Sequence, residues 1–300
     1  MSIKINYSNK SSHKISANLV LFSDDKFNIK DLKKFLSNSE FTYISDLLKT
    51  SDIKKNLFVF ELNSKKKIVL ISIKKNLKTF DIENLGAEFY GRINYGKNSE
   101  YFVISDSLDR KHENFLGYFL HGLKLKSYEF KKYKTKKEIR LISINVLGSK
   151  NKPSAQNQQR FKALEEGTFY ARDLVSEPGN ILHPDEYAKR LNSLKRDGLK
   201  INIYDEKKLK KLGMHALLGV GQGSVRGSYL VTMEWNGAKN NSKPLAFVGK
   251  GVCFDTGGYS LKPARFMEDM TYDMAGSATV VGLMKSLALR KAKINAVGVV

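Results

Sequence analysis

Short apolar runs alternate with helical segments through the first half of this 300-residue chain, and this alternation restricts the fold more than any other feature. The runs have the length and composition of strands, whereas the segments between them carry apolar residues at helical spacing. An α/β domain is therefore expected over residues 1–150. The expected strands are 14–23, 56–62, 66–73, 100–106 and 139–147, and the expected helices are 28–38, 82–93 and 114–130.

A polar stretch with Gly and Pro but no apolar periodicity, residues 148–159, is typical of a linker. Beyond it we expect a second α/β domain over residues 151–300, so that the whole chain has an α/β fold with two α/β domains. Its expected elements are a helix at 158–175, strands at 199–205, 229–235 and 244–252, a short helix at 206–213, a helix from Asp273 and a final strand at 293–300.

The formal net charge of +22 suggests attraction to phosphate-rich partners or acidic surfaces. Lysines far outnumber arginines, however, and in the first half of the chain they are scattered among Asn and Ile. Proteins that read bases and phosphates favour the arginine fork. A solvated basic surface is the first interpretation, and nucleic acid is kept as the alternative partner.

The chain contains one cysteine, Cys253, which cannot form an internal disulfide. This favours a reducing compartment. The N-terminal residues include no continuous apolar stretch of the kind found in signal peptides, and no later run is long enough for a membrane span. We therefore expect a cytoplasmic protein with no membrane partner.

Lys250, Asp255, Lys262 and Asp273 lie close together in the sequence, among glycines that follow an apolar strand. Strand ends with glycine turns are where the ligand sites of α/β sheets gather. Simpler interpretations exist for single residues: Asp273 could cap the helix that follows, and Lys250 could bind phosphate, although GKG lacks the Ser or Thr of a P-loop. Cys253 is most simply a small buried hydrophobic residue.

Taken together, four short stretches resemble the central motif of the leucyl aminopeptidases, the M17 cytosol aminopeptidases: VGKG at 248–251, FDTGG at 254–258, SLKP at 260–263 and YDMAGSA at 272–278. The similarity extends to ARDLVSEPGNILHP at 171–184 and LGMHALLGVGQGS at 212–224, and is fainter in the first half of the chain. The resemblance implies a smaller N-terminal domain with a mixed, macro-like sheet and a C-terminal catalytic peptidase domain.

The resemblance also implies a metalloaminopeptidase that releases N-terminal residues from peptides with two divalent ions, Mn or Zn or else Mg, and bicarbonate as general base. Lys250, Asp255 and Asp273 match metal ligands, with Lys250 acting as a neutral amine. Lys262 matches the catalytic lysine that stabilises the oxyanion, and Met270 matches an apolar wall of the pocket. These five residues form the expected substrate-binding set, and the full-length form is expected to be a homo-oligomer, a hexamer.

In the family, an Asp, a Glu and an Arg from an NTDAEGR-type motif complete the site, and these 300 residues contain no such motif. The final apolar run also stops without a turn or cap. We therefore expect a catalytic domain that is truncated at its C-terminus, and a chain that by itself is poorly soluble and lacks measurable peptidase activity. The alternative from another class is a non-catalytic basic protein that binds nucleic acid, with an affinity that falls steeply as salt rises.

Overall fold

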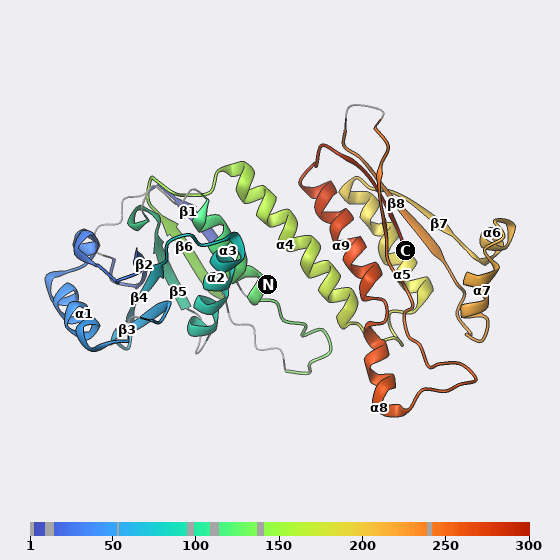
Figure 1. Ribbon diagram of the computed structural model, residues 1–300, viewed down its shortest axis with the longest axis horizontal. Coiled ribbons are helices and arrows are strands. Elements are labelled where there is room, and N and C mark those ends of the chain that lie inside the picture. The colour runs from blue at the N-terminus through green and yellow to red at the C-terminus, as the bar shows by residue number, and fades with distance from the viewer. Residues whose placement is uncertain are drawn as a thin grey trace. The chain divides into compact units, whose positions relative to one another are not determined.

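The computed structural model describes residues 3–9, 15–52, 54–94, 99–108, 114–136, 141–238 and 242–300. The chain divides into two compact units, which we call unit 1 (Met1–Gln158) and unit 2 (Gln159–Val300). Each unit has its own sheet and its own helices (Figure 1), so the expected α/β fold with two α/β parts is confirmed. In the described part of the chain, no helix combines the length and the apolar character that crossing a membrane requires.

Unit 1 is built on a six-stranded sheet in the order β1-β6-β5-β2-β4-β3. Neighbouring strands are parallel except for β3, which pairs antiparallel with β4, so the sheet is mixed. The strands are β1 (Ile3–Ser8), β2 (Asn18–Asp24), β3 (Leu57–Asn63), β4 (Lys66–Ile73), β5 (Ser99–Ile104) and β6 (Ile142–Leu147). The helices are η1 (Lys30–Phe35), α1 (Asn38–Thr50), α2 (Thr79–Ile93), η2 (Ser105–Ser107) and α3 (Phe115–Lys126).

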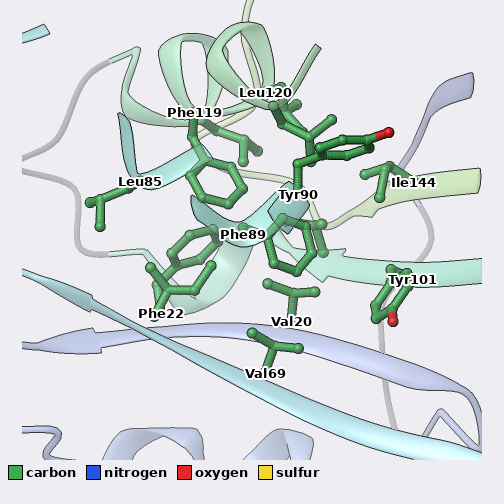
Figure 2. Packing of buried hydrophobic residues seen from close by; sticks show 14 of the residues in the cluster. Val20, Phe22, Val69, Leu85, Phe89, Tyr90, Tyr101, Phe119, Leu120 and Ile144 are labelled. Carbon is green, nitrogen blue, oxygen red and sulfur yellow. The ribbon is translucent and has the colours of Figure 1, made fainter. Parts of the chain in front are cut away.

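The central strands of unit 1 are buried on both faces, as parallel strands with helices on either side must be. Val20 and Phe22 of β2 belong to the cluster under α2 and α3, whereas Leu19 and Leu21, which alternate with them, belong to a second cluster on the side of α1. Figure 2 shows the first cluster, where the Phe22 ring meets the Phe119 ring edge-on at 5.5 Å between centroids. Phe89 stacks on Phe119 at 5.6 Å, so aromatic contacts join the sheet to both helices.

The first helical segment differs from the expectation of a helix over 28–38. A short 3-10 helix occupies Lys30–Phe35, and the α-helix follows it at Asn38–Thr50. A capping box sets this start: the Ser37 hydroxyl accepts from the Glu40 N–H at 3.2 Å, and the Glu40 carboxylate accepts from the Ser37 N–H at 2.9 Å. The box satisfies two N–H groups that the first turn would otherwise leave unpaired, which favours the later helix.

Three further elements differ from the sequence expectations. Strand β1 was not expected, because its apolar alternation is short; it is held by parallel pairing with β6, with Ile3 opposite Ile142. Helix α4 begins at Ala155, inside the stretch expected to be a linker. A short helix, α7 (His215–Gly221), lies in the glycine-rich stretch for which no helix was expected.

Unit 2 contains a four-stranded sheet in the order β7-β8-β10-β9, in which β9 is parallel to β10 and the other pairs are antiparallel. Its strands are β7 (Lys200–Tyr204), β8 (Leu230–Asn236), β9 (Leu245–Val248) and β10 (Asn295–Val299). Its helices are α4 (Ala155–Ser176), α5 (Pro184–Asn192), η3 (Ser193–Asp197), α6 (Glu206–Lys211), α7, α8 (Ala264–Met267), η4 (Glu268–Tyr272) and α9 (Ala275–Leu289).

Helix α9 is the central helix of unit 2 and is apolar on most of its surface. Its buried residues share one core cluster with Val231 and Met233 of β8 and with Ala296 of β10. Helix α4 lies beside it (Figure 1), and a Cβ on Gly282 would come within 2.6 Å of the Gly167 carbonyl oxygen. Packing against the sheet on one side and α4 on the other therefore holds α9 firmly in place.

Two neighbouring lysines of unit 1 test how burial changes the strength of an ion pair. Lys66 pairs with Glu40 at 2.6 Å with side chains 12% and 16% exposed, whereas the Lys67–Glu61 pair is 39% and 65% exposed. We expect Lys66→Met to lower the free energy of unfolding by about 2 kcal/mol, because it leaves a mostly buried carboxylate without its partner. Lys67→Met should cost less than about 0.5 kcal/mol. Urea unfolding followed by circular dichroism measures both.

The effect of Lys66→Met should also depend on pH. Burial acts to raise the pKa of Glu40, but the hydrogen bonds from Lys66 and Ser37 outweigh it and hold the pKa below its ordinary value of 4.5. A depressed folded-state pKa stabilises the fold above the unfolded-state value, and this contribution is lost as pH falls through the folded-state value. The difference between wild type and variant should therefore shrink below about pH 4.5; a difference that stays constant there would contradict this account.

Candidate functional site

The first group of the candidate site follows strand β9. The ladder with β10 continues one residue past the strand, where the Gly249 N–H donates to the Val299 carbonyl at 3.0 Å, and the chain then turns away at Lys250. The Lys250 carbonyl accepts from the Ser277 N–H at 2.9 Å, which joins the turn to the first turn of α9. A Cβ on Gly249 would lie 2.6 Å from the Gly276 carbonyl oxygen, so only glycine allows this approach.

The second group lies on a glycine turn. Gly257 and Gly258 have φ of +93° and +72°, a region that side chains disfavour, and the turn closes where the Lys262 N–H donates to the Thr256 carbonyl at 2.9 Å. This turn places Lys262 Nζ 3.2 Å from Asp255 Oδ2. The Gly257 N–H, which donates to Asp255 Oδ1 at 2.8 Å, is the largest cause of a lowered Asp255 pKa, followed by Lys262; the Lys250 charge contributes as well.

Asp273 closes the site from the side of α9. Its carboxylate does not cap the helix, because the N-cap residue is Met274 and that cap has no side-chain hydrogen bond. The capping interpretation is therefore wrong. Asp273 Oδ1 instead accepts from Lys250 Nζ at 2.5 Å, while its buried Oδ2 has no hydrogen-bond partner.

The structure thus brings the expected residues together as two ion pairs, Lys250 with Asp273 and Lys262 with Asp255. The Asp273 side chain is the most enclosed at 15% exposed, whereas that of Lys250 is 58% exposed. Met270, the expected apolar wall, lies in η4 and is half-buried. In the described part of the chain, no group of three or more His, Cys, Asp and Glu is placed to hold a metal, so the donor set consists of two carboxylates and an amine.

Cys253, close to both ion pairs in the sequence, takes no part in them. It is a free thiol, 7% exposed and packed in the core of unit 2. Burial, helped by the charge of Asp185, raises the pKa of the thiol to about 12. A thiol that stays protonated at neutral pH is neither a nucleophile nor a metal ligand. Its interpretation as a small buried hydrophobic residue is confirmed.

The loop 177–183 also lies against the candidate site, which the sequence reasoning did not anticipate. A Cβ on Gly179 would lie 3.0 Å from the Cβ of Phe254, so the loop backbone contacts the residue that precedes Asp255. The loop is anchored by Glu177, whose side chain is 2% exposed and pairs with Arg190 of α5 at 3.1 Å. The Pro-Gly pair signals a turn, but its contact with Phe254 depends on the tertiary structure.

A buried hydrogen bond behind the site was missed as well. The hydroxyls of Tyr187 on α5 and Ser277 on α9 lie 2.9 Å apart in the core. The spacing of apolar residues on α5 could place Tyr187 inside, but no local signal connects its hydroxyl to Ser277. This hydrogen bond connects α5 directly to the first turn of α9.

Comparison with known proteins identifies the same segment. Residues 169–300 match the model of the cytosol aminopeptidase family, catalytic domain (M17). A probable cytosol aminopeptidase of Nitrobacter winogradskyi is 40% identical over 246 residues, which is 78% of this chain and 48% of that protein. A probable cytosol aminopeptidase of Brucella suis is 50% identical over 185 residues, covering 60% of this chain and 37% of that protein. The chain thus spans less than half the length of these curated relatives.

Solved structures share the fold. A mutant of tomato leucine aminopeptidase matches with a TM-score of 0.77 at 21% identity, covering 99% of this chain and 62% of that one. The bottromycin maturation enzyme BotP in complex with Mn matches with a TM-score of 0.75 at 19% identity, covering 95% of this chain and 59% of that one. At these identities the structures establish the fold, while the sequence relatives and the family match establish the family. The chain belongs to the cytosol aminopeptidase family, M17, and its residues 169–300 are part of that family's catalytic domain.

Proposed function

We propose that this protein is a metal-dependent aminopeptidase that removes N-terminal residues from peptides in the cytosol. The observation that carries the proposal is the convergence of Lys250, Asp255, Lys262 and Asp273 as two neighbouring ion pairs in a chain of this family. Peptides with a free N-terminus are the proposed substrates. The cytosolic location follows the names of the relatives, and assembly as a homo-hexamer is proposed from the resemblance to the family.

The residues fit a divalent cation in two respects. Asp273 Oδ2 is buried and has no hydrogen-bond partner, although a buried carboxylate oxygen is costly unless it is satisfied. Lys250 Nζ lies at the other oxygen, which shows that the position already accommodates positive charge. Carboxylates suit Mg, Mn and Zn alike. Lys250, Asp255 and Asp273 would hold the metal, with Lys250 as the neutral amine, and the proposed second ion needs further donors.

Divalent ions bound at such a site polarise a carbonyl and lower the pKa of water. The remaining chemistry belongs to the side chains. Lys262 donates to the oxygen that becomes negative in the transition state, where a preorganised donor has its greatest effect. Its pairing with Asp255 at 3.2 Å holds it at the site beforehand. Met270 supplies apolar surface for the first side chain of the substrate, and bicarbonate is the proposed general base.

Metal binding tests the ligand assignment without depending on turnover. We expect the purified chain to bind Mn²⁺ in isothermal titration calorimetry, and Asp255→Asn and Asp273→Asn each to weaken binding about 100-fold or more. Asp205→Asn is the matched control: Asp205 caps α6 in the same unit, and Asn caps a helix equally well. Equal binding by all four proteins would refute the assignment.

The turn that carries Asp255 offers a second test. Gly257→Ala places a Cβ 2.4 Å from the Ser260 carbonyl oxygen in addition to straining the backbone, whereas a Cβ on Gly258 meets no atom within 4 Å. We expect Gly257→Ala to weaken Mn²⁺ affinity at least about 10-fold, because it displaces Asp255, and Gly258→Ala to weaken it less. If the two variants bind alike, the geometry of the turn does not control the site.

Turnover tests Lys262. Since the chain spans less than half of its relatives, hydrolysis of leucine p-nitroanilide is assayed with the chain and with a chimera that adds the unmatched part of the Nitrobacter winogradskyi relative. In whichever of these two proteins is active, Lys262→Ala should lower kcat about 100-fold or more, while Mn²⁺ binding is retained. Retained turnover would show that Lys262 is not the oxyanion-stabilising group.

The alternative of a nucleic-acid-binding protein stays a prediction. Some of the basic charge is engaged within unit 1, where Lys66 pairs with Glu40 and Lys67 with Glu61. A DNA gel shift at low salt that disappears near physiological salt and needs no metal would support this alternative.

A further inference from the structure

Ser277 connects three parts of unit 2 through one small side chain and its backbone. It is fully buried in the first turn of α9. Its N–H donates to the Lys250 carbonyl at 2.9 Å, and its hydroxyl donates to the Met274 carbonyl at 2.7 Å. The hydroxyl of Tyr187, from α5, lies 2.9 Å from the Ser277 oxygen. Ser277 therefore joins α5, the first turn of α9 and the turn that carries Lys250.

The direction of the Tyr187–Ser277 bond follows from the number of protons. A serine hydroxyl has a single proton, and that of Ser277 is already directed to the Met274 carbonyl. Tyr187 must therefore be the donor and Ser277 the acceptor. Burial raises the pKa of Tyr187 far above its ordinary value of 10.0, so the phenol keeps its proton at neutral pH.

The approach of the two turns makes their relative position sensitive to this bond. A Cβ on Gly249 would lie 2.6 Å from the Cα of Ser277, and a Cβ on Gly276 would lie 3.2 Å from the Lys250 nitrogen. The backbones are thus in direct contact, with no side chain between them to absorb a shift. The same contact places Lys250 Nζ 2.5 Å from the Asp273 carboxylate.

We propose that Tyr187 and Ser277 are positioning residues, whose hydrogen bond fixes the first turn of α9 against the 249–251 turn and thereby sets the distance between Lys250 and Asp273. The proposal rests on the proposed function, because these two groups are the proposed ligands of one metal. Packing alone does not require the hydroxyl: phenylalanine would fill the same volume, and Ser277 already has its own acceptor. The bond adds a directional constraint between α5 and α9 that apolar contacts do not provide.

The test compares Tyr187→Phe, Ser277→Ala and the double variant with a matched control, Tyr170→Phe. Tyr170 belongs to the same unit and packs against the same core, but its hydroxyl donates to the Arg190 carbonyl of α5 at 3.3 Å rather than to a residue in the first turn of α9. Mn²⁺ affinity is measured by calorimetry, and the visible spectrum of added Co²⁺ reports on ligand geometry. Tyr187→Phe removes only one oxygen and carries the test if Ser277→Ala does not fold.

We expect Tyr187→Phe and Ser277→Ala each to weaken Mn²⁺ affinity about 10-fold and to change the Co²⁺ spectrum, as is usual when a group that orients a ligand is removed. The double variant should be little worse than the poorer single variant, since both remove the same bond. Tyr170→Phe should lower Tm about as much as Tyr187→Phe does, but it should leave the Mn²⁺ affinity and the Co²⁺ spectrum unchanged. Wild-type affinity in Tyr187→Phe, or an equal loss in Tyr170→Phe, would overturn the proposal.

A second measurement separates this proposal from the proposed function. Hydrogen exchange at the backbone amides of 249–251 and 274–278 should be faster in Tyr187→Phe than in Tyr170→Phe, because the Ser277 amide is held by the Lys250 carbonyl. If the wild type binds no Mn²⁺, the proposed function fails, and the exchange rates still decide whether Tyr187 positions the turn. Unchanged exchange rates at these residues would refute the positioning role, whether or not the protein binds Mn²⁺.

Discussion

The Lys250–Asp273 half of the candidate site depends on one backbone contact, the hydrogen bond from the Ser277 N–H to the Lys250 carbonyl. It joins a strand end to a helix start that lie far apart in the sequence, and it forms only because Gly249 and Gly276 present no side chains at the crossing. The glycines of VGKG and MAGS are therefore as important to the site as its charged residues. A side chain at Gly249 would push the Lys250 turn away from α9 and so separate Lys250 from Asp273, although neither of these two residues had been changed.

The charged side chains of the site pair with one another, but they differ in how far they are exposed to solvent. Asp273 is mostly buried and one of its oxygens is unsatisfied, while its partner Lys250 is largely exposed. An ion pair with this asymmetry contributes little stability, because the exposed ammonium is well solvated and the enclosed carboxylate has lost its water. An arrangement that adds so little stability agrees with the proposal that these groups serve a ligand, as expected at functional sites.

Unit 2 also presents apolar side chains close to this site. Strand β9 lies at the edge of its sheet, with Leu245 57% and Val248 77% exposed, and Phe254 and Leu261 beyond it are 40% and 68% exposed. Exposed apolar groups this close together in the sequence are characteristic of surfaces that contact another polypeptide or a ligand. The core of unit 2, in contrast, is continuous around α9, so the unit is well packed where helices cover the sheet.

The sequence by itself determined the α/β class and most strands, and it identified the candidate residues of the site. These depend on short-range patterns: short continuous apolar runs mark β2 and β4, and the Gly-rich motifs mark the turns at Lys250 and Asp255. It did not determine where α1 begins, since the Ser37–Glu40 box competes with an equally periodic segment just before it. Only the tertiary structure decided that Asp273 pairs with Lys250 and that Tyr187 bonds to Ser277. These contacts join residues brought together by the packing of α5 and α9 and by the β9–α9 crossing, which no local pattern encodes.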